Sequence, residues 1–162
     1  SAPGRLVNLK VGDLNGDGKP DLAATQLLSS GITIFPNESE TELQFGSPID
    51  IATDERPWGI DFGDLDGDKR PDIVVASITK KSVTILNNTS TAGGFTFQQL
   101  IVPTTFINRH IRLGDLDGDG KPDVSFTSID DNNLGVPASK ISVMRNTSCV
   151  TPVISPKGPL TI

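Results

Sequence analysis

The stretch GDLDGDGKPD, residues 114–123, places four aspartates within ten positions, where like charges should repel one another. The chain also contains GDLNGDGKPD at 12–21 and GDLDGDKRPD at 63–72, so each copy begins 51 residues after the one before it. A fixed period of this length is typical of propeller blades or stacked repeats. A sandwich of unrelated strands is the alternative, but it does not explain the period.

Short apolar segments surround each acidic stretch with the same period. Apolar residues such as Leu9 and Val11 alternate with polar ones before the stretch, as in a half-buried strand. The segment after the stretch is more continuously apolar, as in a strand covered on both faces. The predicted strands lie at 7–11, 21–25, 31–35 and 43–51, at 58–62, 72–77, 82–86 and 95–103, and at 109–113, 123–128 and 140–144. The sequence therefore predicts an all-β protein of about three four-stranded antiparallel propeller blades, although the third copy shows no obvious fourth strand.

The spacing of the strands divides residues 1–148 into three repeats, at about 5–55, 56–106 and 107–148. The proline-containing residues 149–162 are predicted to form a linker or the start of a truncated following module. A propeller closes with about four to eight blades. Three blades therefore predict either a fragment of a longer array or self-association that completes a propeller.

The acidic stretch follows the pattern D-x-[DN]-x-D-[GK]-x-x-D, with side-chain oxygens at positions 1, 3, 5 and 9. Calcium is a hard cation that accepts about six to eight oxygen ligands in flexible geometry, and the backbone carbonyl at position 7 supplies a further oxygen. Each loop is therefore predicted to bind one Ca²⁺, up to three in the chain. The predicted ligands are Asp13, Asn15, Asp17, Lys19 through its carbonyl and Asp21; Asp64, Asp66, Asp68, Arg70 through its carbonyl and Asp72; and Asp115, Asp117, Asp119, Lys121 through its carbonyl and Asp123.

Other interpretations of the loops are weaker. Asp, Asn, Gly and Pro also favour turns, but three copies in register, each with three or four carboxylates, favour a cation that neutralises them. Magnesium prefers strict octahedral geometry with retained water, and zinc is disfavoured because no Cys or His lies nearby. The first half of the loop is similar to an EF-hand loop, but position 12 is Ala24, Val75 or Phe126 instead of Glu. The loop is therefore predicted to be a calcium-binding hairpin turn.

The three loops are not equivalent. Position 6, where a sharp turn favours glycine, is Gly18 in the first loop, Lys69 in the second and Gly120 in the third. A non-glycine residue in a left-handed conformation costs about 1 kcal/mol. The first loop has Asn15 in place of a carboxylate. The third loop is therefore predicted to bind calcium most tightly.

Charge and composition exclude several classes of function. The formal net charge of −6 argues against nucleic acid as a partner, and no apolar run approaches the length of about 18 residues expected of a membrane span. His110 and Cys149 are the only histidine and the only cysteine, and neither forms part of a convincing catalytic arrangement. No acid–base pair is evident outside the loops, so a non-catalytic protein is predicted.

The segments GDLNGDGKPDLAAT, GDLDGDKRPDIVVAS and GDLDGDGKPDVSFTS resemble the FG-GAP/VCBS repeats of secreted bacterial surface proteins and of integrin α-subunit propellers. SVTILNNTS and SVMRNTS are similar to the strand that closes such bacterial repeats. The resemblance covers roughly residues 5–148. It implies propeller blades, calcium in the turn between the first two strands of a blade, and a secreted or cell-surface location in a bacterium.

The function expected from these observations is that of a calcium-binding, non-catalytic extracellular propeller segment. It would serve adhesion or bind a protein or polysaccharide ligand. The alternatives are an accessory or catalytic part of a secreted polysaccharide-degrading enzyme and a passive spacer in a larger assembly.

Overall fold

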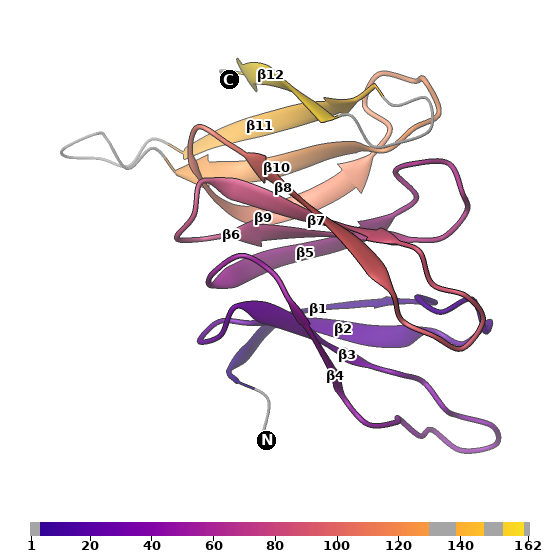
Figure 1. The fold of residues 1–162 in the computed structure, drawn as a ribbon. Helices are drawn as coiled ribbons and strands as arrows, with labels where there is room; N and C mark the ends of the chain where they lie inside the picture. The colour runs from indigo at the N-terminus through magenta and orange to yellow at the C-terminus, as the bar shows by residue number, and fades with distance from the viewer. Residues whose placement is uncertain (1–3, 130–138, 148–153, 161–162) are drawn as a thin grey trace.

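The computed structural model describes residues 4–129 and 139–147, and the backbone of 154–160. These residues form twelve strands in three four-stranded antiparallel sheets, and the described part of the chain contains no helix. The sheets are stacked face to face in chain order, and none closes into a barrel (Figure 1). The predicted all-β fold of about three propeller blades is confirmed.

Each sheet is a meander whose strands pair with their neighbours in the chain. The first sheet contains β1 (Leu6–Gly12), β2 (Asp21–Gln26), β3 (Gly31–Phe35) and β4 (Ile49–Ala52). The second contains β5 (Pro57–Gly63), β6 (Asp72–Ser77), β7 (Ser82–Asn88) and β8 (Phe97–Pro103). The third contains β9 (Ile107–Gly114), β10 (Asp123–Ile129), β11 (Ser139–Asn146) and β12 (Ile154–Leu160). The first strands contact one another from sheet to sheet, so the outer edge of each sheet is its fourth strand.

The fourth strand of the third sheet corrects the prediction for the end of the chain. Residues 154–160, which lie in the stretch predicted to be a linker or the start of a following module, form β12 and pair antiparallel with β11. The prolines at 156 and 159 conceal this strand in the sequence, since proline lacks the N–H group that a central strand needs. An edge strand tolerates proline, and β12 is an edge strand. The rest of the predicted linker lies outside the described residues.

Two hydrophobic cores fill the spaces between the sheets, and the middle sheet contributes to both. In β6, Ile73 and Val75 pack in the core shared with the first sheet, whereas Val74 and Ala76 pack in the core shared with the third. Successive side chains of a strand point to opposite faces. The prediction that the apolar run of 72–77 is covered on both faces is therefore confirmed.

The first strand of the first sheet differs from its counterparts. Ile60 of β5 is 2% exposed and lies in the core, but Leu9, which occupies the same place in β1, is 57% exposed. The alternating pattern is thus the same in both strands, and the predicted burial of Leu9 is wrong. No sheet of the described residues covers that face of the first sheet.

Candidate metal centre

The three acidic loops join the first and second strands of the three sheets. They lie at the same end of the stack (Figure 1). The second and third loops are neighbours, because Asp64 and Asp66 line one hollow together with Gly120 and Lys121. The stacking of the sheets therefore brings acidic loops that are 51 residues apart in sequence to adjacent positions.

Backbone N–H groups of the turn hold the first aspartate of each loop. Asp115 accepts hydrogen bonds from the N–H groups of Gly118 (2.7 Å) and Gly120 (2.9 Å). The equivalent contacts hold Asp13 and Asp64. The hydrogen bond from Gly120, with those of its neighbours, lowers the pKa of Asp115 below its usual value. This carboxylate therefore stays ionised and keeps the turn wrapped around it.

The last aspartate of each loop is buried and clamps the loop to the third strand. In the second sheet, Asp72 accepts hydrogen bonds from the backbone N–H groups of Leu65 (2.8 Å) and Asn88 (2.8 Å). Asp21 and Asp123 make the same two contacts in their sheets. Burial raises the pKa of Asp72 to about 6, and it raises the pKa of Asp21 as well. The clamp is a structural role that the motif alone does not reveal.

Carboxylates at positions 1, 3 and 9 converge in two of the loops. Oxygens of Asp64, Asp66 and Asp72 all lie within 4.8 Å of one another, and so do oxygens of the third-loop residues Asp115, Asp117 and Asp123. Two ligands at about 2.3–2.6 Å from one Ca²⁺ are at most about 5 Å apart. Each group therefore fits the donor set of a calcium ion.

The first loop has a carboxamide where the other two have the second carboxylate of the group. Asn15 is buried, and its side-chain oxygen accepts a hydrogen bond from the backbone N–H of Asp17 (3.0 Å). Asp13 and Asp21 hold the same backbone groups as their counterparts in the other loops. The first loop thus keeps the geometry of the turn with one negative charge fewer.

Position 5 lies outside the two groups of converging carboxylates. Asp68 forms an ion pair with Arg70, and Asp119 pairs with Arg145 of β11 (3.4 Å). Arg145 also pairs through its Nε with Asp117. The structure therefore places a guanidinium group beside the second and third loops. The acidic motif does not predict the contact of Arg145, because this residue lies in a strand more than twenty residues after the third loop. Ligation by Asp17, Asp68 and Asp119, and by the carbonyls of Lys19, Arg70 and Lys121, stays a prediction.

The backbone at position 6 is left-handed in all three loops. Gly18 has a φ of 83°, Gly120 a φ of 85° and Lys69 a φ of 72°. The prediction that Lys69 adopts a strained conformation, which glycine would adopt freely, is confirmed. The second loop therefore carries a backbone strain, at Lys69, that the other two loops do not have.

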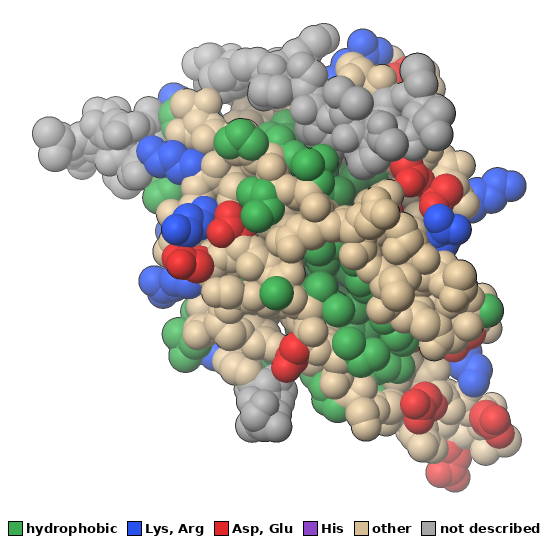
Figure 2. Space-filling view, viewed as in Figure 1, with side chains coloured by type: hydrophobic (Ala, Val, Ile, Leu, Met, Phe, Trp, Pro, Cys, Tyr) green, Lys and Arg blue, Asp and Glu red, His purple; other side chains and the backbone are tan. Residues whose placement is uncertain are grey.

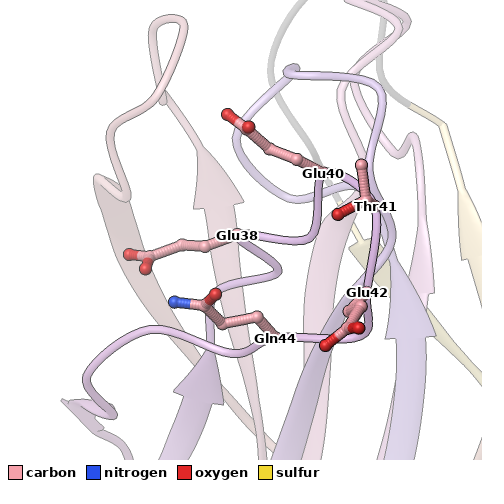
Figure 3. A pocket seen from close by; sticks show the side chains of 5 residues that line it. All are labelled: Glu38, Glu40, Thr41, Glu42 and Gln44. Atoms are coloured by element: carbon pink, nitrogen blue, oxygen red, sulfur yellow. The ribbon is translucent and has the colours of Figure 1, made fainter.

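A second acidic region lies in the connection between β3 and β4, outside the repeated motif. Glu38, Glu40 and Glu42 line a hollow there with Thr41 and Gln44 (Figure 3). The three carboxylates point away from one another (Figure 3). Figure 2 shows acidic side chains gathered over this connection. The arrangement raises the local negative charge, but it lacks the converging oxygens of the acidic loops.

A family model described as an FG-GAP-like repeat matches residues 13–75 and again 65–125. No curated protein matches the chain. No helix in the described residues is both long enough and apolar enough to span a membrane. The two family matches include all three acidic loops and together cover 113 of 162 residues, from 13 to 125. The chain therefore belongs to the FG-GAP-like repeat family, whose members include extracellular, integrin-type propellers.

Proposed function

We propose that this chain is a calcium-binding, non-catalytic segment of an extracellular bacterial protein, secreted or at the cell surface, in which the acidic loops hold the ions. The observation that carries this proposal is the convergence of three carboxylates in the second and third loops within 4.8 Å. The three carboxylates within each loop repel one another unless cations offset their charge, and, among the described residues, a guanidinium group, that of Arg145, contacts such a carboxylate only in the third loop. All the donors are oxygens, which suits a hard divalent ion.

The buried clamp supports a bound cation in the second loop. Asp72 is fully buried, and burial raises its pKa to about 6, so its ionised form is costly in the metal-free chain. A divalent ion beside Asp64 and Asp66 would offset that cost. Because the unfolded chain does not hold these oxygens together, binding of the ion would add to the stability of the fold.

The position of the loops supports a role in adhesion or ligand binding. Loops at the end of a rigid stack of sheets are common binding surfaces. The hollow between the second and third loops is lined by exposed Gly67 and Gly120 and by carboxylates of the second loop. We expect a protein or polysaccharide ligand to contact this end of the stack, where bound calcium would offer open coordination positions to its oxygens.

Calorimetric titration with calcium, combined with thermal unfolding in calcium and in EDTA, tests the metal site. Asp66→Ala and Asp117→Ala each remove one converging side chain, because asparagine at this position would restore the donor set that the first loop has with Asn15. Glu40→Ala removes an acidic group outside the loops as the matched control. We expect each loop variant to lose one bound ion and the control to lose none. Saturating calcium at about 100 times the dissociation constant should stabilise the fold by about 2.7 kcal/mol per site. An unchanged melting temperature after chelation would contradict the proposal.

A further inference from the structure

Each sheet has two faces, which play different parts in the stack. We call the face that packs on the preceding sheet the leading face, and in the second sheet it carries Ile60 and Phe62. We call the face that receives the following sheet the trailing face, and in the first sheet it carries Leu14 and Ile32. The joint between the second and third sheets repeats this arrangement. The stack therefore contains two copies of one kind of joint.

A close approach at a glycine marks both joints. A Cβ atom on Gly12 would lie 2.9 Å from a ring carbon of Phe62, and one on Gly63 would lie 2.8 Å from Cδ1 of Leu113. Both distances are too short for a Cβ contact. Each glycine therefore leaves room for a leading-face side chain of the next sheet. Gly114 has the same place in the third sheet, but a Cβ there would meet nothing within 4 Å.

An asparagine also links the sheets at both joints. Nδ2 of Asn88 donates a hydrogen bond to the carbonyl of Leu14 (2.9 Å), and Nδ2 of Asn146 donates one to the carbonyl of Leu65 (2.8 Å). Asn37 stands 51 residues before Asn88, at the same place in the first sheet. Among the described residues, its Nδ2 donates only within its own repeat, to the carbonyl of Pro20 (2.9 Å).

The two ends of the stack thus carry the two halves of an unmade joint. At the trailing end, Leu116 is 59% exposed, whereas its counterparts Leu14 and Leu65 are 1% exposed. At the leading end, Val11 is 56% exposed, and it occupies the place that Phe62 and Leu113 have at the inner joints. The first sheet carries the hydrogen-bond donor and the apolar side chain of such a joint. The third sheet of the same chain carries the acceptor carbonyl and the space for that side chain.

We propose that two copies of this chain associate head to tail, the trailing face of each third sheet packing on the leading face of the other copy's first sheet. In this joint Val11 occupies the space over Gly114, and Nδ2 of Asn37 donates to the carbonyl of Leu116. Two such joints join six sheets into one ring, within the range of about four to eight blades in which propellers close. A head-to-tail contact that closes in this way gives a symmetric dimer without free ends.

The charges at this joint make the association depend on calcium, and this step rests on the proposed function. At the first inner joint, the N–H of Gly93, between β7 and β8, donates to the carbonyl of Asn15 in the preceding acidic loop (3.3 Å). The connection between β3 and β4 would lie in the same way on the third acidic loop of the other copy. It carries Glu38, Glu40 and Glu42, so both sides of the joint are negative without bound cations.

Lys10 and Arg112 add a smaller repulsion near the inner strands. They occupy the same place in their repeats, so the joint brings Arg112 of one copy towards Lys10 of the other. Lys10 already forms an ion pair with the buried carboxylate of Asp61 (2.6 Å). This pairing weakens the repulsion, because the partner guanidinium meets a neutralised pair instead of a free cation.

Analytical ultracentrifugation of the chain in millimolar calcium and in EDTA tests the dimer. We expect the mass to double in calcium and to stop at two copies, and to fall to that of one chain in EDTA. Gly114→Leu closes the empty space at the trailing end, and Val11→Glu places a charge at the leading end. Each should abolish the doubling in calcium and keep the wild-type melting temperature in EDTA, where the wild-type chain is also single. The control is Ile101→Glu, a similarly exposed apolar residue on the outer strand β8 (51%), which should dimerise as the wild type does.

Three results would overturn the dimer. They are a wild-type chain that stays single at high micromolar concentration in calcium, open-ended growth beyond two copies, and a Gly114→Leu variant that associates normally. If the wild-type chain stays single, its end faces pack on blades of a different sequence. Calcium titration of the wild-type chain, followed by ultracentrifugation of the same sample, separates this inference from the proposed function. Bound calcium without association refutes the dimer alone, whereas association without bound calcium refutes the metal site.

Discussion

The second and third acidic loops carry nearly the same ten residues, yet they lie in different surroundings. The third sheet covers the second loop, so Leu65 is fully buried and its carbonyl accepts a hydrogen bond from Asn146. No sheet of the described residues covers the third loop, and Leu116 is exposed. The aspartates Asp64 and Asp66 are half-buried, whereas Asp115 and Asp117 of the third loop are exposed.

The difference shows that the neighbouring sheet, and not the motif, sets how far each loop is exposed to solvent. In the covered loop, burial raises the pKa of Asp72 to about 6. In the open loop, the N–H of Gly120 and neighbouring backbone donors lower the pKa of Asp115. An ion in the second loop would therefore lie beneath the third sheet, whereas an ion in the third loop would lie at a site that the described sheets leave open. Each of the following predictions compares the two loops.

Removal of the buried clamp should give the largest difference. In Asp72→Ala, two backbone N–H groups lose their acceptor in a dry environment, so we expect a loss of about 2–5 kcal/mol in the free energy of unfolding. In Asp123→Ala, water can reach the N–H of exposed Leu116, so about half that loss is expected. Urea denaturation in EDTA, where the chain is single and no ion is bound, measures both losses. Equal losses would show that the covering sheet does not matter.

The repeat in the sequence predicted most of the site, because each loop is a local structure. The positions of the strands, the turn at position 6 and the grouping of carboxylates follow from residues within one copy. The clamp partners Asn37 and Asn88 could also have been predicted, since they are spaced by the same 51 residues as the loops. Their polar character made them resemble ordinary turn residues, and only the hydrogen bonds of the structure reveal their role.

The remaining errors concern contacts between sheets and at sheet edges. The pattern of β1 shows which side chains share a face, but not whether another sheet covers that face, and so the burial of Leu9 could not be derived. β12 was missed because proline argues against a central strand and says little about an edge. Arg145 approaches Asp117 and Asp119 from another strand, outside any motif.

Substitution of the residue at position 6 should change the stability of the fold by an intermediate amount. Lys69→Gly removes a side chain from a left-handed backbone and should stabilise the fold by about 1 kcal/mol. Gly120→Ala should destabilise it by a similar amount. Calcium titration of the two variants should then bring the affinities of the second and third loops closer together, because the third loop is predicted to bind most tightly. A second loop that already binds more tightly in the wild type would refute that ranking.

The dependence of stability on pH should differ in sign between the loops. In EDTA, the folded chain binds a proton on Asp72 more tightly than the unfolded chain does, because the pKa of about 6 lies above the usual 3.8. Stability should therefore rise as the pH falls through 6, and this gain should be complete below 3.8. Asp115 acts in the opposite sense, since its lowered pKa contributes stability above 3.8 that is lost as the pH falls through its folded value. Urea denaturation of an Asp21→Asn background at about pH 7 and about pH 5 isolates the second loop, because this substitution removes the raised pKa of Asp21 and Asp115 stays ionised across that window. Asp72→Asn should remove the gain, whereas Asp115→Asn should leave it in place. Loss of stability over this window in the wild-type chain would show that the covered loop is no less solvated than the open one.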